Sequence, residues 1–422
     1  MAPNTTRGGR YVRQLTGYSA FVPATLPPDP PVDLGRLAPV QSAADLAIGR
    51  LDGLSRTLPN PDLFVAMYVR REAVLSSQIE GTQSSLDDVL AYELDSRSAE
   101  LPGDIAEVVN HVAAMNYGLE RLATLPLSLR LIREIHGRLI EGVRGAEKGP
   151  GEFRTSQNWI GPAGASLRAA AFVPPSPTDM AAALDNFERF LHSTDLPPLV
   201  HAGVAHAQFE TIHPFLDGNG RVGRLLITFL LVHRGVLQRP LLYLSYFLKR
   251  HRAEYYDRLM AIREGGDWEG WLQFFLRGVA ETSEEATGTA TAIVGMREAH
   301  RASVQAWGGH SLKLLDYLFE RPLINVNVAS EYLGVSWPTA NKLVQQFEEA
   351  GILGEVTGHK RNRVYRYDPY VALFSEPVPT ADEVAVQTTE ADQASVPLPG
   401  HDQAAPPDGA MAGPPTRGRS SR

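Results

Sequence analysis

The stretch His213–Arg224, HPFLDGNGRVGR, places one histidine, one carboxylate, three glycines and two arginines within twelve residues, between apolar segments. Its early glycines let successive backbone N–H groups converge on one point, forming an anion-binding nest. A helix is predicted to begin near Arg221, and its first N–H groups add partial positive charge. Arg221 and Arg224 then project from nearly the same face of the first turn. The combination indicates a site for the phosphates of a nucleotide.

The other side chains of this stretch suit chemistry on such a phosphate. Asp217 would repel a phosphate unless Mg²⁺ lay between them, and Mg²⁺ prefers one carboxylate plus phosphate oxygens. His213 titrates near neutral pH and follows an apolar helix, which places it to act as a general base for a hydroxyl. Pro214 ends that helix, and Phe215 can anchor the loop in the core. The sequence has no G-x-x-x-x-G-K-[ST] segment, which excludes a P-loop.

Composition describes a protein with enough apolar residues for two or three domains. The chain has 422 residues, 43% of them hydrophobic, and no cysteine, which excludes disulfides and thiolate metal sites. Its longest largely apolar run, Leu225–Val232, is far too short to span a bilayer, and no apolar stretch follows the N-terminus. We therefore expect a cytoplasmic protein without a membrane partner. The net charge of −8 gives no global sign of nucleic-acid binding.

Hydrophobic periodicity predicts a mainly α fold in five parts. The first two are an extended Pro-rich segment and a helical region, and they are followed by a helical core that is interrupted by a β-hairpin in the Gly- and Pro-rich stretch 151–177. A linker helix then leads to a small α+β module, and the polar, Pro-rich tail is predicted to be disordered. In order, these parts are residues 1–45, 46–126, 127–280, 281–374 and 375–422.

The C-terminal module has the pattern of a winged helix. Residues 327–353 have a helix–turn–helix rhythm, and residues 354–368 read as a two-stranded wing. Polar residues gather at the start of its second helix and basic residues in the wing: Ser336, Trp337, Thr339, Asn341, Lys342, Lys360, Arg361, Arg363 and Arg366. Yet residues 301–372 carry eight basic and seven acidic residues, whereas DNA readers are usually more basic. DNA binding and protein docking therefore both stay open.

The opening stretch resembles the motif of the Fic family, H-P-F-x-[DE]-G-N-G-R-x-x-R, at every fixed position. Three further segments resemble the family's flap, its run-in to the motif and its later helices: GEFRTSQNWIG, AHAQFETIHPF and AEYYDRLMAIREGGDWEGWLQFF. Together they cover about residues 20–277. The resemblance implies a Fic-type helical bundle with a β-hairpin flap.

Members of this family typically transfer AMP from ATP to a Ser, Thr or Tyr hydroxyl of a protein. The resemblance therefore implies a protein adenylyltransferase, a nucleotidyltransferase that uses ATP and Mg²⁺. His213 would be the base and Asp217 the Mg²⁺ ligand. The implied phosphate cradle is Gly218, Asn219 and Gly220, with Asn219 on the α-phosphate and Arg221 and Arg224 on the β- and γ-phosphates. Gly220 argues against the kinase branch of the family, which has lysine there.

The same resemblance implies an inhibitory segment and an adenosine contact. SSQIEG at residues 76–81 matches the family's inhibitory pattern [ST]-x-x-x-E-[GN], with Ser76 first and Glu80 as its acid. A bidentate pair between Glu80 and Arg224 would block the γ-phosphate position. Tyr255 and Tyr256 fall where the family contacts adenosine, although Arg263 stands where some relatives have asparagine. In some relatives the glutamate supports removal of AMP, so that reaction stays open.

The expected partner is a target protein. An open strand edge at Trp159, Ile160 and Gly161 would bind the target segment by β-augmentation. Self-modification and a homodimer are further expectations. The alternatives are transfer of phosphate or UMP, and a DNA-bound regulator that senses a nucleotide without transferring it. The other histidines of the helical core, His136, His201 and His206, are interpreted as packing or hydrogen-bonding residues.

Overall fold

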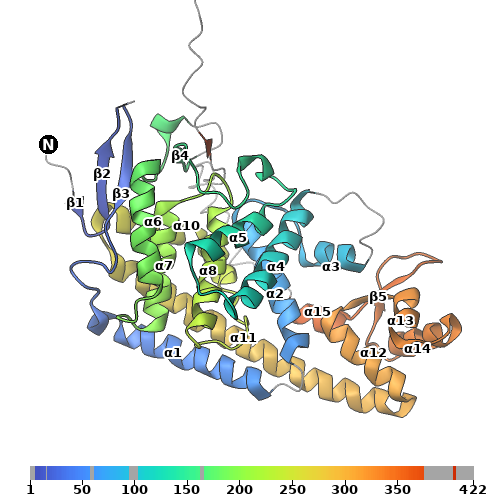
Figure 1. Ribbon diagram of the computed structural model, residues 1–422. Coiled ribbons are helices and arrows are strands. Elements are labelled where there is room, and N and C mark those ends of the chain that lie inside the picture. Colours follow the sequence, from blue (N-terminus) through green and yellow to red (C-terminus); the bar gives the residue numbers. More distant parts are fainter. Residues whose placement is uncertain are drawn as a thin grey trace, which may run out of the picture.

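The chain folds into a helical bundle with a smaller module at one end (Figure 1). The computed structural model describes residues 5–15, 17–57, 61–94, 103–161, 166–374 and 403–404, and the statements below concern these residues. The predicted mainly α class is confirmed, since strands are short and form small sheets of two or three strands. No helix within the described ranges is both long and apolar enough to cross a membrane.

A small antiparallel sheet precedes the first helix. Its strands are β1 (Thr5–Thr6), β2 (Gly9–Arg13) and β3 (Ser19–Pro23), in that order. Helix α1 (Leu34–Thr57) is capped by Asp33, whose Oδ1 accepts a hydrogen bond from the Arg36 N–H at 3.1 Å. The prediction of an extended segment up to residue 45 is therefore wrong from Leu34 onward. The prolines suggested an extended chain, but Pro39 lies inside the helix.

The following helices build the bundle and lead to the C-terminal module. They are α2 (Pro61–Ile79), α3 (Leu86–Leu94), α4 (Gly103–Leu122), α5 (Leu129–Leu139), α6 (Pro177–Leu191), α7 (Pro198–Ile212), α8 (Asn219–His233), α9 (Ser245–Arg250), α10 (Arg252–Gly265) and α11 (Trp268–Val304). Helix α11 has 37 residues, a length of about 55 Å at the usual rise per residue. It runs beside α1 along the base of the bundle and extends to the module (Figure 1).

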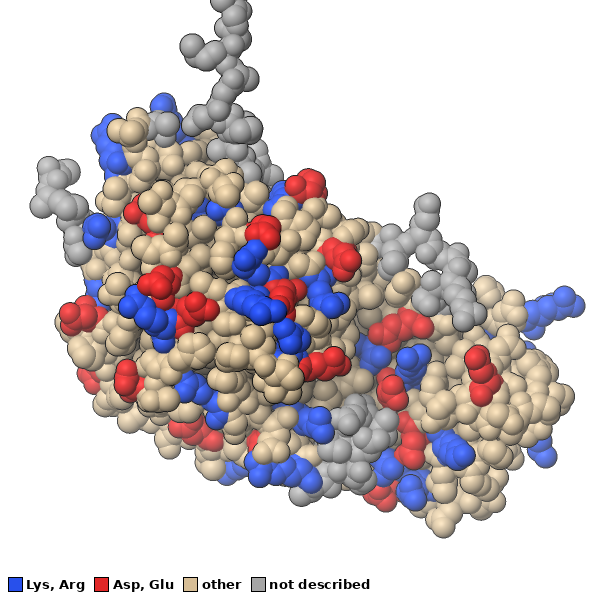
Figure 2. Space-filling model, in the orientation of Figure 1, with Lys and Arg blue, Asp and Glu red and all other residues tan. Residues whose placement is uncertain are grey.

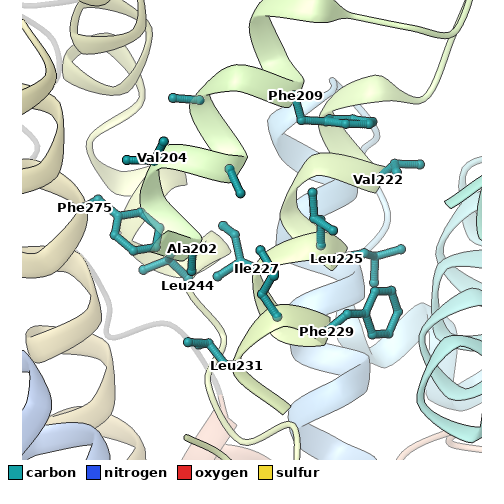
Figure 3. Packing of buried hydrophobic residues seen from close by; sticks show 14 of the residues in the cluster. Ala202, Val204, Phe209, Val222, Leu225, Ile227, Phe229, Leu231, Leu244 and Phe275 are labelled. Atoms are coloured by element: carbon teal, nitrogen blue, oxygen red, sulfur yellow. The ribbon is translucent and has the colours of Figure 1, made fainter. Parts of the chain in front are cut away.

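Helices α7 and α8 lie at the centre of the hydrophobic core. Every residue of α7 from Leu199 to Ile212 is buried, so this helix is enclosed on all sides rather than amphipathic. Figure 3 shows Phe209 and Leu225 of this pair in the same packed cluster as Phe275 of α11. Burying each such side chain stabilises the fold by about 1.5–3 kcal/mol. The loop between α7 and α8 is therefore held at both ends by firmly packed helices.

Helix α4 approaches α8 closely at Gly118. A Cβ at this position would overlap the ring of Phe229, so only glycine permits this separation. Residues four apart on α4, Glu107, His111 and Met115, are buried on the same side as Gly118. The close approach therefore brings a face of α4 that carries a carboxylate against the first turns of α8.

The Gly- and Pro-rich stretch 151–177 turns back on itself, as predicted, but with a minimal ladder. Ile160 and Phe172 exchange two main-chain hydrogen bonds of 2.9 and 3.0 Å and form an isolated antiparallel pair. Two prolines, Pro174 and Pro175, follow at once and lack the N–H groups that a longer ladder needs. Strand β4 (Asn158–Trp159) instead pairs antiparallel with β8 (Gln403–Ala404). The rest of the predicted disordered tail lies outside the described residues.

The C-terminal module contains the two helices and the two short strands expected from residues 327–368, and a further helix and strand precede them. The elements are α12 (Gly309–Glu320), β5 (Leu323–Asn325), α13 (Val326–Leu333), α14 (Trp337–Glu349), β6 (Gly354–Glu355), β7 (Val364–Arg366) and α15 (Asp368–Val371). The antiparallel sheet has the order β5-β7-β6, so the wing returns to pair with the strand before α13.

This module packs directly on α2 and α3. The ring of Tyr68 in α2 meets that of Phe374 edge-on at 5.2 Å, and both belong to one hydrophobic cluster with the module's core. Arg70 Nη1 donates to the Glu320 carbonyl at 3.2 Å. Arg366, expected on a DNA-binding wing, instead pairs with Asp87 of α3 at 2.9 Å. The helix that precedes Glu80 is therefore supported by the C-terminal module.

Candidate active site

His213 stands where α7 ends and the loop to α8 begins. Its backbone is left-handed, with φ 50° and ψ 61°, a conformation that costs a non-glycine residue roughly 1–3 kcal/mol. Gly218, with φ 78°, is left-handed without that cost and directly precedes α8. The predicted helix start is confirmed at Asn219. A strained residue next to a glycine turn requires neighbours that fix the loop.

Two residues of the flap stretch, Arg154 and Asn158, supply that support. Arg154 Nε donates to the His213 carbonyl at 2.9 Å, and Arg154 N donates to the Pro214 carbonyl at 2.9 Å. Asn158 Nδ2 donates to the carbonyls of Phe215 at 2.8 Å and His213 at 3.3 Å. Both side chains are buried. Sequence reasoning missed their role, because no local spacing rule links residues more than fifty positions apart.

Asn219 closes the loop rather than facing the nest. Its Oδ1 accepts from the Phe215 N–H at 2.8 Å, and its Nδ2 donates to the Phe215 carbonyl at 2.8 Å. The side chain is fully buried. Since both ends of the amide are engaged with the backbone, this placement does not support the expected contact with an α-phosphate. No side chain caps α8 at Gly218, so the first-turn N–H groups of the helix carry the anion-binding potential.

The two arginines of the motif lie side by side in the core, and each is paired with an acid. Arg221 Nη1 donates to Glu107 Oε2 of α4 at 2.8 Å. Arg224 Nη2 donates to Glu80 Oε1 at 2.6 Å and to the Ser76 carbonyl at 3.0 Å, and its Nε donates to Ser76 Oγ at 2.8 Å. The sequence predicted a bidentate pair with Glu80. The structure corrects this, since one Glu80 oxygen and Ser76 share the guanidinium.

Glu107 and Glu80, the acidic partners of the two arginines, differ in their exposure to solvent. The side chain of Glu107 is 3% exposed and that of Glu80 is 22% exposed. Burial raises the pKa of Glu107, and Arg221 opposes this shift only in part. Burial would also raise the pKa of Glu80, but the charge and hydrogen bond of Arg224 outweigh it and lower that pKa. Glu107 is thus a fixed partner within the core, whereas Glu80 lies at the edge of the site.

Asp217 is held between two cations. Its Oδ2 lies 2.9 Å from Lys148 Nζ, and its Oδ1 lies 3.5 Å from Arg221 Nη2. Burial would raise the pKa of Asp217, but the hydrogen bond and charge of Lys148 outweigh it and lower that pKa. Lys148 was not identified from the sequence. It lies on a short 3-10 turn (Ala146–Lys148), sixty-nine residues before Asp217.

The donor set around Asp217 fits a magnesium ion that is shared with phosphates. No cluster of three or more His, Cys, Asp or Glu side chains that could hold a metal occurs in the described part of the chain. Mg²⁺ commonly takes one or two carboxylates and completes its shell with phosphate oxygens and water. The ionised Asp217 is such a carboxylate, and the ammonium of Lys148 already shows that its Oδ2 attracts a cation.

His136 contacts the loop through a hydrogen bond to Asp217 and ring stacking on Phe215. Its Nδ1 accepts from the Gly151 N–H at 2.9 Å, so its Nε2 carries the proton and donates to the Asp217 carbonyl at 3.0 Å. The ring stacks on Phe215 with centroids 3.7 Å apart. Burial lowers the pKa of His136 to about 4, so the ring is neutral at pH 7. The interpretation of His136 as a hydrogen-bonding residue agrees with these contacts.

Comparison with known families agrees with this arrangement. The N-terminal model of the Fic/DOC family matches residues 39–120, and the Fic/DOC family model matches residues 126–231. The chain carries a Fic domain. The second match ends within α8, so it contains the whole loop from His213 to Arg224 and the flap stretch that supports it. The first match contains Ser76, Glu80 and Glu107, the partners of the two motif arginines.

Curated relatives of this Fic domain include proteins named protein adenylyltransferase Fic. Those of Drosophila persimilis and Aedes aegypti are each 33% identical over 215 residues, which cover 49% of this chain and 38% of each relative. The match thus spans less than half of those proteins. A solved Fic family protein from Desulfovibrio desulfuricans aligns over 78% of this chain and 96% of its own, with 20% identity and a TM-score of 0.48.

The side chains of Trp159, Tyr255 and Tyr256 differ in their accessibility. Trp159 is buried against Ala20 and Val173, so it anchors the flap rather than offering a free side chain. Tyr255 is also buried, and its hydroxyl bonds His206 Nε2 at 2.9 Å. Tyr256, the other tyrosine of the pair, is partly exposed. Of the two tyrosines, Tyr256 is therefore the one placed to contact a base.

Arg263, which stands where some Fic-family relatives have asparagine, has a structural role in this chain. It is buried, and its Nη2 donates to the Glu210 carbonyl at 3.2 Å at the end of α7. Its guanidinium also lies 3.8 Å from the centroid of the Phe172 ring in the flap. Burial lowers the pKa of Arg263 to about 10. The residue therefore ties the flap to α7, which is a structural task in this chain.

Proposed function

We propose that this chain is a protein adenylyltransferase, which transfers AMP from ATP to a hydroxyl group of a target protein and is inhibited by Glu80. The observation that carries the proposal is the pairing of Arg224 with Glu80 and Ser76 beside the uncapped start of α8. An arginine at a helix N-terminus is an anion site. Here a carboxylate of the same chain occupies it. The names of the curated relatives support the same activity.

In the proposed reaction, His213 accepts the proton of the target hydroxyl. The hydroxyl oxygen then forms a bond to the α-phosphorus of ATP, and the bond from that phosphorus to the bridging oxygen of the β-phosphate breaks. Pyrophosphate leaves, and AMP stays on the target. His213 later returns the proton to water. The first-turn N–H groups of α8 and the two motif arginines would stabilise the phosphate charge, so catalysis depends mainly on positioning and electrostatics.

Asp217 would hold a magnesium ion on the phosphates of ATP. Bound there, the ion would neutralise phosphate charge. Lys148 and Arg221 lower the pKa of Asp217, so the carboxylate is ionised, and the ion would replace Lys148 at Oδ2. Gly218 and Gly220 would let the phosphates approach the backbone.

Inhibition would act through Arg224. While Glu80 holds this guanidinium, a γ-phosphate has to displace a carboxylate from it. A charge-assisted hydrogen bond contributes about 1.5–3 kcal/mol, which corresponds to roughly a ten- to hundredfold smaller population of the competent state. Because Glu80 is the more exposed of the two acids, it is the partner that leaves. The target would approach along the flap at Trp159, Ile160 and Gly161, where β8 pairs with β4 in the structure.

The test uses ATP labelled on either the α- or the γ-phosphate, with Mg²⁺ and a cell lysate as the source of target. Wild type is compared with Glu80→Gly, Glu80→Ala and His213→Ala. Glu134→Ala is the matched control, since it removes a glutamate that is ion-paired with Arg121 and Arg130 rather than with an arginine of the motif. We expect label from the α-phosphate only, ten- to hundredfold more in both Glu80 variants, unchanged in Glu134→Ala and absent in His213→Ala.

Two results would contradict the proposal. Label from the γ-phosphate alone would identify a kinase, and equal α-label in wild type and both Glu80 variants would remove the inhibitory role of Glu80. Comparing Glu80→Gly with Glu80→Ala separates loss of the carboxylate from added backbone freedom.

A further inference from the structure

The C-terminal module carries a groove that the proposed transfer reaction does not use. It has a volume of about 690 Å³ and lies between α14 and the wing. Helix α14 contributes Trp337, Asn341 and Gln345, which are four residues apart and therefore lie on one face. Trp337 is 52% exposed at the start of the helix.

We infer that this groove binds double-stranded DNA, with the exposed face of α14 in the major groove and the wing on the phosphates. The wing lines the groove with Lys360, Arg361 and Arg363. All three are exposed, and basic side chains protrude from the edge of the module in Figure 2. Phosphate contacts of this kind position a protein on a duplex, while a helix in the groove reads the bases.

The distribution of charge supports this inference better than the total charge does. Residues 301–372 contain nearly equal numbers of acids and bases, yet none of the described residues that line the groove is acidic. No ion pair within the described part of the chain involves Lys360 or Arg361. Glu348 and Glu355 interact electrostatically with Arg363, and Glu355 also accepts hydrogen bonds from the N–H groups of Thr357 and Gly358. The groove is thus more basic than its module.

The uncharged lining also matches the edges of bases. Amide side chains supply it from α14, from the wing and from α13, namely Asn327, Asn341, Gln345 and Asn362, whereas the Asn325 amide oxygen caps α13. Asparagine and glutamine pair with adenine through one donor and one acceptor. A groove for an apolar peptide would need a mostly apolar lining, whereas most residues here are amides or cations. The chemistry therefore favours DNA over a docked protein segment.

The test measures binding of the full chain to a fluorescent 24-base-pair duplex of mixed sequence between 50 and 200 mM salt. Three phosphate contacts predict a slope of about −3 for the logarithm of affinity against that of salt concentration. We expect at least a tenfold loss of affinity and loss of most of this slope in a triple variant that carries Lys360→Ala, Arg361→Ala and Arg363→Ala. The control variant Arg10→Ala, Arg36→Ala, Arg50→Ala loses the same charge from exposed positions outside the groove and should bind like wild type.

A second pair of variants tests base reading. Asn341→Ala and Gln345→Ala should change which sequences are selected from a random duplex pool while leaving the salt slope unchanged. An absence of duplex binding at 50 mM salt, equal losses in the two triple variants, or preference for single-stranded DNA or an acidic peptide would overturn the inference. All variants should keep wild-type melting temperatures and AMP transfer, so a failure here is distinguishable from failure of the proposed activity.

Discussion

The carboxylate of Glu80 fills the space above Gly220. A Cβ built on this glycine would overlap Glu80 Oε1 and lie 3.0 Å from Arg224 Nη1. A side chain at residue 220 and the carboxylate of Glu80 therefore compete for one small volume. Any side chain at residue 220 must push Glu80 away from the arginine.

Gly220→Ala should consequently remove most of the effect of losing Glu80. We expect Glu80→Ala to raise AMP transfer roughly ten- to hundredfold in wild type, but only about threefold or less in Gly220→Ala, because the pair is already broken there. Initial rates of the four proteins give this coupling directly, and a direct effect of the methyl group on ATP binding cancels in the ratio. Gly288→Ala, at a position with nothing nearby, is the control. Equal activation in both backgrounds would show that Glu80 does not act from this position.

Lys148 should weaken metal binding in the absence of nucleotide. Its ammonium lies 2.9 Å from Asp217 Oδ2, on the oxygen that a metal would need. A metal that binds Asp217 has to break this partly buried ion pair, which contributes about 1 kcal/mol and so lowers the metal affinity roughly fivefold. We therefore expect Lys148→Met to bind Mn²⁺ about five times more tightly than wild type. Electron paramagnetic resonance titration of free Mn²⁺ measures this without any catalysis. Asp217→Asn should abolish the binding, and Lys313→Met on the exposed face of α12 should not change it. Weaker binding in Lys148→Met would contradict the competition.

The neutral state of His136 should make the fold sensitive to mild acid. Its pKa is about 4 in the folded chain and about 6.5 when unfolded. The unfolded state therefore binds the proton first, and stability present above pH 6.5 is lost as the pH falls toward 4. Between pH 7 and pH 5, protonation of this group alone should lower the free energy of unfolding by about 2 kcal/mol.

Urea titrations of wild type and His136→Gln at both pH values measure that loss. The difference between the free energies of unfolding of the two proteins cancels the contribution of carboxylates and other histidines. The destabilisation caused by His136→Gln should shrink by about 2 kcal/mol from pH 7 to pH 5. If the two proteins differed by the same free energy of unfolding at pH 7 and pH 5, His136 would not be buried in its neutral form.

Local sequence identified the chemistry of the loop well. The helix predicted to begin near Arg221 begins at Asn219, and the adjacency of Arg221 and Arg224 and the pairing of Glu80 with Arg224 also appear in the structure. The first two depend on neighbours within a few residues, where helix geometry fixes which side chains share a face. The third came from the resemblance to the Fic family, because Glu80 and Arg224 are 144 residues apart.

Only the folded chain decided which groups support that loop and which are diverted from it. Glu107, Lys148, Arg154 and Asn158 reach the site from three other segments, and no periodicity relates them to the motif. Asn219 turns its amide to the backbone because the loop is buried and its polar groups need partners. In the same way, the proline-rich N-terminus contains a helix because Asp33 caps it.

The sequence by itself thus determined the helical class and the reactive groups of the motif, because these follow from local spacing and residue chemistry. Tertiary structure decided the accessibility of each group. It buried Tyr255 and left Tyr256 partly exposed, and it turned Arg366 toward Asp87 while Lys360 and Arg361 stayed outside. Burial and pairing depend on which distant surfaces meet, and that is settled only when the helices pack.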